Sequence, residues 1–112
     1  MEMKEIDSLI NNKQLNKAEF ELSKLHNKYK NDSEYLFLRS RIFYLKKLYY
    51  IAVDTLLISL EFSQDDKIYS FLGEIYKVLD QGELSNKILD KNLRIATVND
   101  LKDTMTGLYR KK

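Results

Sequence analysis

The chain has 112 residues, of which 44% are hydrophobic and 32% charged, enough apolar side chains for one domain core and too many for a disordered segment. Cysteine is absent, which excludes disulfides and thiolate metal sites, and the single histidine cannot supply a histidine-rich metal site. A net charge of +2, with acids interspersed among the bases, argues against a nucleic-acid-binding surface, and the lack of proline argues against a turn-rich barrel or sandwich.

The apolar pattern in the first third of the chain predicts two helices. Apolar residues at helical spacing predict a helix that begins near Met3 and is interrupted by the polar stretch 11–14. A second, amphipathic helix is predicted up to about residue 30, because its apolar residues alternate in steps of three and four: Leu15, Ala18, Leu22, Leu25 and Tyr29. Asp32 or Ser33 is then expected to cap the next helix.

The middle of the chain predicts two helices, Glu34–Lys46 and Tyr49–Phe62, that are apolar on almost every side. Helices of this kind cannot face much water, so both are expected to lie between neighbours. Tyr50 is left over at the turn between them and is expected to be exposed.

The last third predicts a fifth helix, which follows the capping stretch 63–66 and ends near Gly82. A sixth helix is expected to run to about residue 97, through Leu84, Ile88, Leu89, Leu93 and Ile95. Asn99 or Asp100 then caps a last short helix that carries Leu101, Met105, Leu108 and Tyr109. We therefore predict one all-α domain, 1–112, with antiparallel hairpins at about 3–30, 33–63 and 66–97 and a capping helix at about 100–111.

The hairpins are similar to one another in sequence. Ala18 and Ala52 are 34 positions apart, and Ala52 and Ser85 are 33 apart. The same steps connect three leucines, Leu22, Leu56 and Leu89. Small residues let the two helices of a hairpin approach closely, and large ones, such as Leu56 and Leu89, are expected to fill the gap between hairpins. A fixed period of this length is typical of helical-repeat proteins.

These residues resemble the tetratricopeptide repeat family, whose unit is two antiparallel helices. Its first-helix signature is matched closely by residues 69–76 and loosely by Leu36, Ser40 and Phe43, although the proline that often closes a unit is missing. Ala18 with Leu22, and Ala52 with Leu56, match the second helix. The resemblance covers roughly residues 3–98 and implies a short right-handed α-solenoid of about seven helices.

In that family the first helices of successive units line a concave groove that binds a peptide or a helix. The resemblance therefore implies a partner-binding groove formed by Phe37, Arg41, Tyr44, Lys67, Ser70, Glu74 and Lys77. Glu34 shares the centre of this register. Met3, Asp7 and Ile10 would lie at one end, and Leu101, Thr104 and Leu108 would close the other end or occupy the groove.

Two alternatives at the centre of the groove stay open. Phe37 and Tyr44 either anchor a partner or pack against the neighbouring hairpin. Arg41 could clamp a partner's carboxylate or pair with Glu74 or Glu34. The carboxylate clamp that some family members use on heat-shock chaperones is not expected here, because Asp7 and Glu74 would repel a carboxylate.

The leading functional hypothesis is a protein-binding adaptor or scaffold. The alternatives are a subunit that associates with its own copies through the apolar middle hairpin and, less favoured, an RNA-binding helical repeat. No phosphate loop, nucleophile elbow or zinc motif is present, so we expect neither enzymatic activity nor a cofactor or metal, and His26 is expected to be solvated on the outer face. No segment matches a signal peptide or membrane helix, so the expected location is cytoplasmic, without membrane or nucleic-acid partners.

Overall fold

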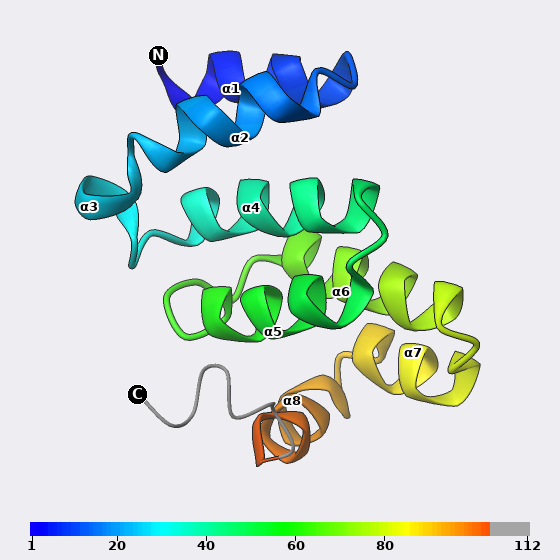
Figure 1. Cartoon of the computed structure of the whole chain (residues 1–112). Coiled ribbons are helices and arrows are strands. Elements are labelled where there is room, and N and C mark those ends of the chain that lie inside the picture. The colour runs from blue at the N-terminus through cyan, green and yellow to red at the C-terminus, as the bar shows by residue number, and fades with distance from the viewer. Residues whose placement is uncertain (104–112) are drawn as a thin grey trace.

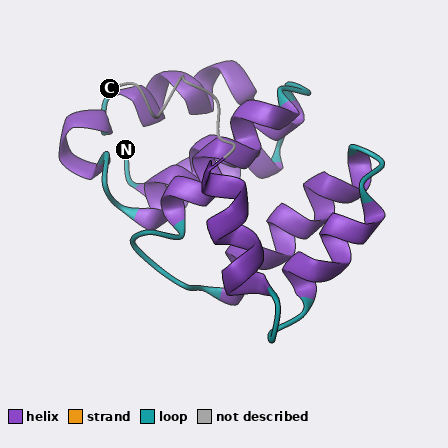
Figure 2. Ribbon diagram, turned by 90° about the horizontal axis from the view of Figure 1, so that it is seen from below, coloured by secondary structure: helices purple, strands orange, loops and turns teal. Residues whose placement is uncertain are grey.

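The computed structural model describes residues 1–103, and every regular element in that range is a helix (Figure 2). The helices are α1 (Met3–Asn11), α2 (Leu15–Ser23), α3 (His26–Tyr29), α4 (Ser33–Leu45), α5 (Tyr49–Ser59), α6 (Asp66–Val78), α7 (Gly82–Leu89) and α8 (Arg94–Asp103). The predicted all-α class is confirmed. The described part of the chain holds eight helices rather than about seven, because the single-turn helix α3 was not predicted.

Consecutive helices pair as hairpins, and the hairpins pack in chain order (Figure 1). The pairs are α1 with α2, α4 with α5 and α6 with α7. Contacts of α4 with α1 and α2 join the first two hairpins, contacts between α5 and α6 join the last two, and α8 packs against α7. As expected for helices that are apolar all round, α4 and α5 therefore lie between neighbours.

The turn inside each hairpin has the same backbone conformation. Lys13, Lys47 and Asp80 have φ of 63°, 65° and 61°, in the left-handed region, and follow one another by 34 and 33 positions. At each turn the next amide donates to a carbonyl five residues back: Gln14 to Leu9 at 2.9 Å, Leu48 to Phe43 at 2.9 Å and Gln81 to Tyr76 at 2.8 Å. This Schellman pattern satisfies the last carbonyls of the first helix in each hairpin, so the sequence repeat corresponds to a structural one.

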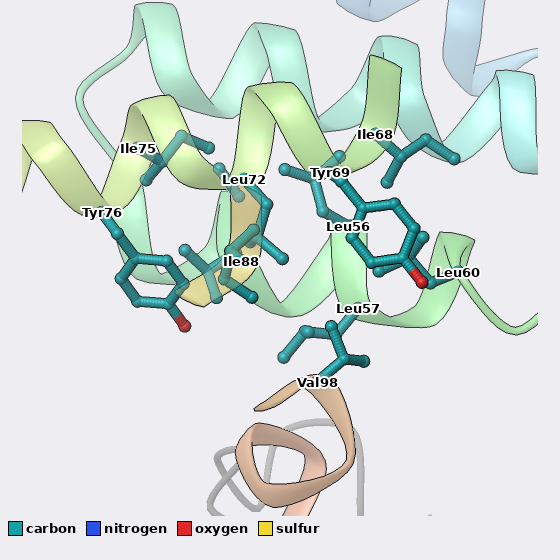
Figure 3. Packing of buried hydrophobic residues seen from close by; sticks show 12 residues of the cluster. Leu56, Leu57, Leu60, Ile68, Tyr69, Leu72, Ile75, Tyr76, Ile88 and Val98 are labelled. Atoms are coloured by element: carbon teal, nitrogen blue, oxygen red, sulfur yellow. The ribbon is translucent and has the colours of Figure 1, made fainter. Parts of the chain in front are cut away.

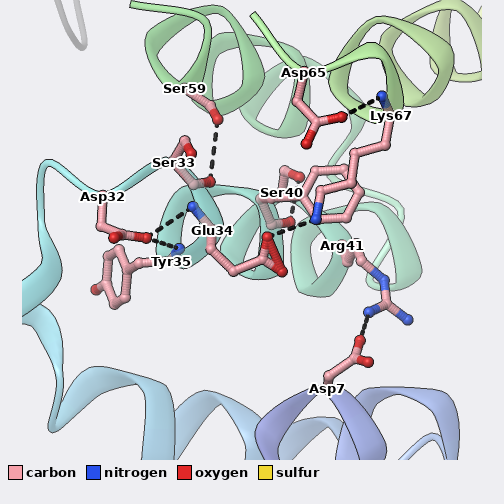
Figure 4. A network of polar contacts seen from close by, with 11 residues as sticks. Asp7, Asp32, Ser33, Glu34, Tyr35, Ser40, Arg41, Ser59, Asp65 and Lys67 are labelled. Atoms are coloured by element: carbon pink, nitrogen blue, oxygen red, sulfur yellow. Dashed lines mark hydrogen bonds and ion pairs between the residues drawn. The ribbon is translucent and has the colours of Figure 1, made fainter. Parts of the chain in front are cut away.

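The starts of α4 and α6 are capped by aspartates. The Oδ1 atom of Asp32 accepts from the amides of Glu34 at 2.8 Å and Tyr35 at 3.1 Å, and Asp65 accepts from the amide of Lys67 at 3.0 Å (Figure 4). Of the two predicted caps of α4, Asp32 is therefore the one used. A capping side chain of this kind contributes about 1 kcal/mol.

The buried side chains form two hydrophobic clusters. One joins α1, α2 and α4 through residues such as Ile10, Leu22 and Tyr35. The other joins α5, α6, α7 and α8 through residues such as Leu56 and Leu72, and in it Val98 of α8 lies beside Leu57 of α5 (Figure 3). Among the buried side chains the division between the clusters falls between α4 and α5, while the partly buried Phe37, Phe43 and Tyr44 of α4 pack against the second cluster.

The close approach of α6 and α7 depends on Gly73. The Oγ atom of buried Ser85 donates to the carbonyl oxygen of Gly73 at 2.7 Å, and a Cβ atom at Gly73 would lie 2.9 Å from two side-chain atoms of Leu89. The expected role of small residues is confirmed, since Ala18, Ser40, Ala52 and Ser85 are fully buried as well. The expected role of Leu89 is wrong, because its side chain covers Gly73 and stays 46% exposed.

Four predicted helices end earlier than expected. The helix expected to end at Phe62 ends at Ser59, and the one expected to end near Gly82 ends at Val78, so that Gly82 begins α7. The helix expected up to residue 30 ends at Ser23, and the chain turns before α3. The helix expected up to residue 97 ends at Leu89, because Asp90 has an extended conformation and its Oδ1 accepts from the amide of Asn92 at 2.8 Å.

The last described helix also differs from the prediction at its start. Helix α8 begins at Arg94, so Asn99 and Asp100 lie inside it and do not cap it. Its Leu101 is partly buried against the cluster of α5, α6 and α7. The predicted positions at Thr104, Met105, Leu108 and Tyr109 lie outside the described residues.

Candidate functional site

The first helices of the three hairpins share one face, and ion pairs connect them there. Arg41 of α4 forms an ion pair with Asp7 of α1 (Figure 4). Its Nη2 also donates to the Oδ1 of Asn11 at 2.6 Å. The expectation that Arg41 pairs with Glu74 or Glu34 is wrong. Asp7 and Arg41 were nevertheless assigned to one register, and the 34-residue step between them connects equivalent positions of successive hairpins.

A second ion pair connects α4 with α6. Lys67 donates from Nζ to the Oε2 of Glu34 at 2.6 Å, and the same ammonium lies 4.8 Å from the centre of the Phe37 ring. Both carboxylate and ammonium are nearly half exposed, so the pair contributes at most about 1 kcal/mol to stability. Its main consequence is geometric, since it fixes the direction of both side chains across the face.

Phe37 and Tyr44 both pack against the next hairpin. Their rings meet Phe71 of α6 edge to face, with centroid distances of 5.7 Å for Phe37 and 5.2 Å for Tyr44. Tyr44 also contacts Tyr49, at 5.5 Å. Of the two alternatives for these aromatics, packing is the one observed, and it leaves part of each ring accessible, since both residues are only partly buried.

A cavity of about 230 Å³ opens on this face between α1, α4 and α6. Its walls are Ile10, Asn11, Lys13, Arg41, Tyr44, Leu45, Phe71 and Glu74. Burial, and then the neighbouring Glu74 carboxylate, raise the pKa of the Tyr44 hydroxyl. Because the hydroxyl stays neutral well into the alkaline range, it can donate a hydrogen bond within this opening.

The structure thus brings together only part of the predicted groove. Arg41, Tyr44 and Glu74 line the cavity, whereas Phe37 and Lys67 lie beside it and Ser70 and Lys77 are exposed without lining it. Sequence analysis missed the cavity residue Phe71. A step of 34 residues from Phe37 leads to Phe71, but the 33-residue spacing used for this hairpin pointed to Ser70.

Other expectations have simpler outcomes. Tyr50 is 62% exposed, as predicted. His26 is exposed, but its Nδ1 lies 3.0 Å from the hydroxyl of Tyr35, so its ring has a defined neighbour. Within residues 1–103, no three histidine, cysteine or acidic side chains are grouped to hold a metal ion, and no helix is long and apolar enough to span a membrane.

The middle hairpin was expected to leave an apolar surface that a second copy could cover. In the structure Val53, Leu56, Leu57 and Leu60 of this hairpin are at most 5% exposed, because other helices of the chain cover them. The premise for self-association through this surface therefore weakens, while the oligomeric state stays a prediction.

Comparison with known proteins adds no relative: no family model, no curated protein and no solved structure matches the chain.

Proposed function

We propose that this chain is a non-catalytic protein-interaction module of the tetratricopeptide type that binds an extended peptide or helix on the face formed by α1, α4 and α6. The observation that carries the proposal is the cavity between these three helices, which aromatic and charged side chains line together. Its Tyr44 and Phe71 rings provide apolar contact, and Arg41, Lys13 and Glu74 provide charges of both signs. Aromatic residues and arginine dominate the binding energy of many protein interfaces.

The ion pairs of the face support the same proposal. Arg41 and Lys67 are held by Asp7 and Glu34, so these four side chains are positioned before a partner arrives. Prepositioned side chains lose less conformational entropy on binding, which favours affinity. The cavity itself is too small for a helix, so we expect one side chain of the partner to enter it while the rest of the partner lies along the face.

The test uses peptides selected from a random displayed library against the immobilised protein. Glu74 is exposed and lines the cavity, so Glu74→Lys should weaken the selected peptides at least about tenfold without unfolding the protein. Glu83→Lys is the matched control, because Glu83 is also an exposed helical glutamate but lies on α7, away from the cavity.

Isothermal titration with both variants and with Tyr44→Ala decides the matter, with circular dichroism as the check on folding. Peptides that bind a folded Glu74→Lys variant and a folded Tyr44→Ala variant as tightly as the original protein would contradict the assignment of this face. Weakening by Glu83→Lys alone would move the binding surface to α7.

A further inference from the structure

A second cavity, of about 280 Å³, lies between α2 and α4, two helices that run side by side in Figure 1. It shares no lining residue with the cavity of the α1–α4–α6 face. Its lining residues are Glu19, Leu22, Ser23, His26, Tyr35, Arg39, Ile42 and Phe43. The volume is close to the lower end of the range for small-ligand pockets, roughly 300 Å³.

The floor of this cavity is largely apolar. Leu22, Tyr35 and Ile42 form it and are at most 3% exposed, and the partly buried Phe43 adds a second aromatic ring. Such a floor favours a flat apolar body that excludes water from it.

The lining of the cavity has two charged residues, Arg39 and Glu19, whose surroundings differ. The guanidinium of Arg39 lies 5.8 Å from the ring centre of Tyr35 and 5.5 Å from that of Phe43, and within residues 1–103 no carboxylate forms an ion pair with it. Glu19 is the one acid of the lining, and its Oε1 accepts from Lys46 Nζ at 2.6 Å, which compensates its charge. The guanidinium is therefore the one charged group of the lining whose charge is left uncompensated.

The Tyr35 hydroxyl and the His26 ring are polar groups that lie near the Arg39 guanidinium. The hydroxyl lies 3.0 Å from the Nδ1 of His26, and burial raises the pKa of the hydroxyl although the nearby Arg39 acts in the opposite direction. The neutral hydroxyl and the histidine ring are hydrogen-bonding groups beside the guanidinium. Together the three suit an oxyanion at the polar side of an apolar cavity.

We propose that the α2–α4 cavity is a binding site for a small aromatic monocarboxylate, with the carboxylate on Arg39 and the ring lying on the floor of Leu22 and Ile42 and against Phe43. A guanidinium pairs with a carboxylate through two parallel hydrogen bonds, which a neutral amide of the same shape cannot reproduce. For a ligand of roughly ten non-hydrogen atoms, a dissociation constant of about 0.1–1 mM is expected.

The probe is 3-phenylpropionate, titrated into the ¹⁵N-labelled full chain to about 5 mM, well above the expected dissociation constant. Saturable shifts of amides in the ranges 19–26 and 35–43 are expected. 3-Phenylpropionamide, the matched neutral probe, should bind at least about tenfold more weakly, since it lacks the charge that Arg39 recognises.

Variants separate the charge of Arg39 from its packing. Arg39→Gln should weaken 3-phenylpropionate at least about tenfold, whereas Arg94→Gln should not, although Arg94 also lies over a tyrosine ring, 4.1 Å from the centre of Tyr69. Ser23→Phe fills the mouth from an exposed position and should abolish binding with Arg39 intact, so it serves as the test where Arg39→Gln lowers stability.

The proposal is overturned if the original protein shows no saturable shifts, or if the shifts lie around Arg41 and Tyr44 instead. Equal affinity for the acid and the amide overturns it too, as does unchanged binding by a folded Ser23→Phe variant.

Discussion

The contact between Gly73 and Leu89 allows a double-mutant cycle whose outcome changes sign with the background. Gly73 has no positive φ and lies inside α6, so its backbone accepts any residue. Alanine in a helix interior is more stable than glycine by about 0.8–1.0 kcal/mol. On propensity alone, Gly73→Ala should therefore stabilise the protein.

The packing reverses this expectation. The new methyl group would lie 2.9 Å from the Cγ and Cδ2 of Leu89, closer than carbon atoms approach without displacement. Overpacking of this kind costs about 1–3 kcal/mol. We expect a cost of about 2 kcal/mol, below the upper end of this range, because Leu89 is 46% exposed and can move partly outward. The net expectation for Gly73→Ala is a loss of about 1 kcal/mol.

Truncating Leu89 removes the clash and restores the propensity gain. In the Leu89→Ala background, Gly73→Ala should stabilise the protein by about 1 kcal/mol, which makes the coupling between the two sites about 2 kcal/mol. Urea denaturation of the four proteins, followed by far-ultraviolet circular dichroism, measures each free energy of unfolding. The reasoning is refuted if Gly73→Ala stabilises both backgrounds equally, because Leu89 would then move aside without loss.

Three further predictions concern the cap of α4, the repeated turn and a buried tyrosine. Asp32→Ala should lower the free energy of unfolding by about 1 kcal/mol, while Asp32→Asn, which keeps the Oδ1 acceptor, should change it little. Equal losses from the two variants would show that the cap does not depend on this acceptor. Lys47→Gly should raise the stability by about 0.5–1 kcal/mol because Lys47 has φ of 65°, whereas Lys77→Gly, inside a helix, should lower it, and a loss from both would contradict the argument. Burial, then Asp54 and Tyr50, raise the pKa of Tyr76 from 10.0 to about 12. The stabilisation that comes from the neutral hydroxyl is therefore complete below pH 10 and is lost as the pH rises towards 12, which lowers the free energy of unfolding by up to roughly 2–3 kcal/mol. Tyr76→Phe should lack this part of the alkaline decline in urea denaturation, and identical pH profiles for the two proteins would count against it.

The repeat itself could be predicted because it depends on local signals. Small residues at the steps Ala18, Ala52 and Ser85 mark positions where two helices touch, and each is fully buried in the structure. The aspartate caps of α4 and α6 act on amides two and three residues away, so a short stretch of sequence is sufficient to locate them.

The errors arose where a local polar signal competed with apolar spacing. Leu89 and Leu93 are four residues apart, which suggests a continuous helix, but Asp90 between them ends α7 by accepting from the amide of Asn92. The polar residues 90–92 indicated a turn, whereas the spacing of Leu89 and Leu93 indicated a continuous helix. Apolar spacing alone does not show which of these two signals is stronger. Asn and Asp favour such turns because their side chains bond nearby backbone amides.

The candidate site was less predictable because its contacts depend on packing between hairpins. Three acids, Asp7, Glu34 and Glu74, share the register of Arg41, and only the relative position of α1 and α4 decides that Asp7 is its partner. Phe71 was missed for a similar reason, since a shift of one residue in spacing separates it from Ser70. Local patterns specify helices well, whereas the rotation of each helix is determined by the whole core.

The unit that repeats in the sequence is not the unit that buries apolar surface. The hairpin is the repeat, but α4 belongs to the cluster with α1 and α2, and α5 belongs to the cluster with α6, α7 and α8. Removal of the first hairpin would therefore expose Tyr35, Leu36, Leu38 and Ile42 along α4 while leaving the larger cluster closed. The smallest fragment able to fold without the first hairpin is nevertheless expected to keep α4, because Phe37, Phe43 and Tyr44 of α4 pack against the larger cluster, and to need polar side chains on the face of α4 that α1 and α2 covered.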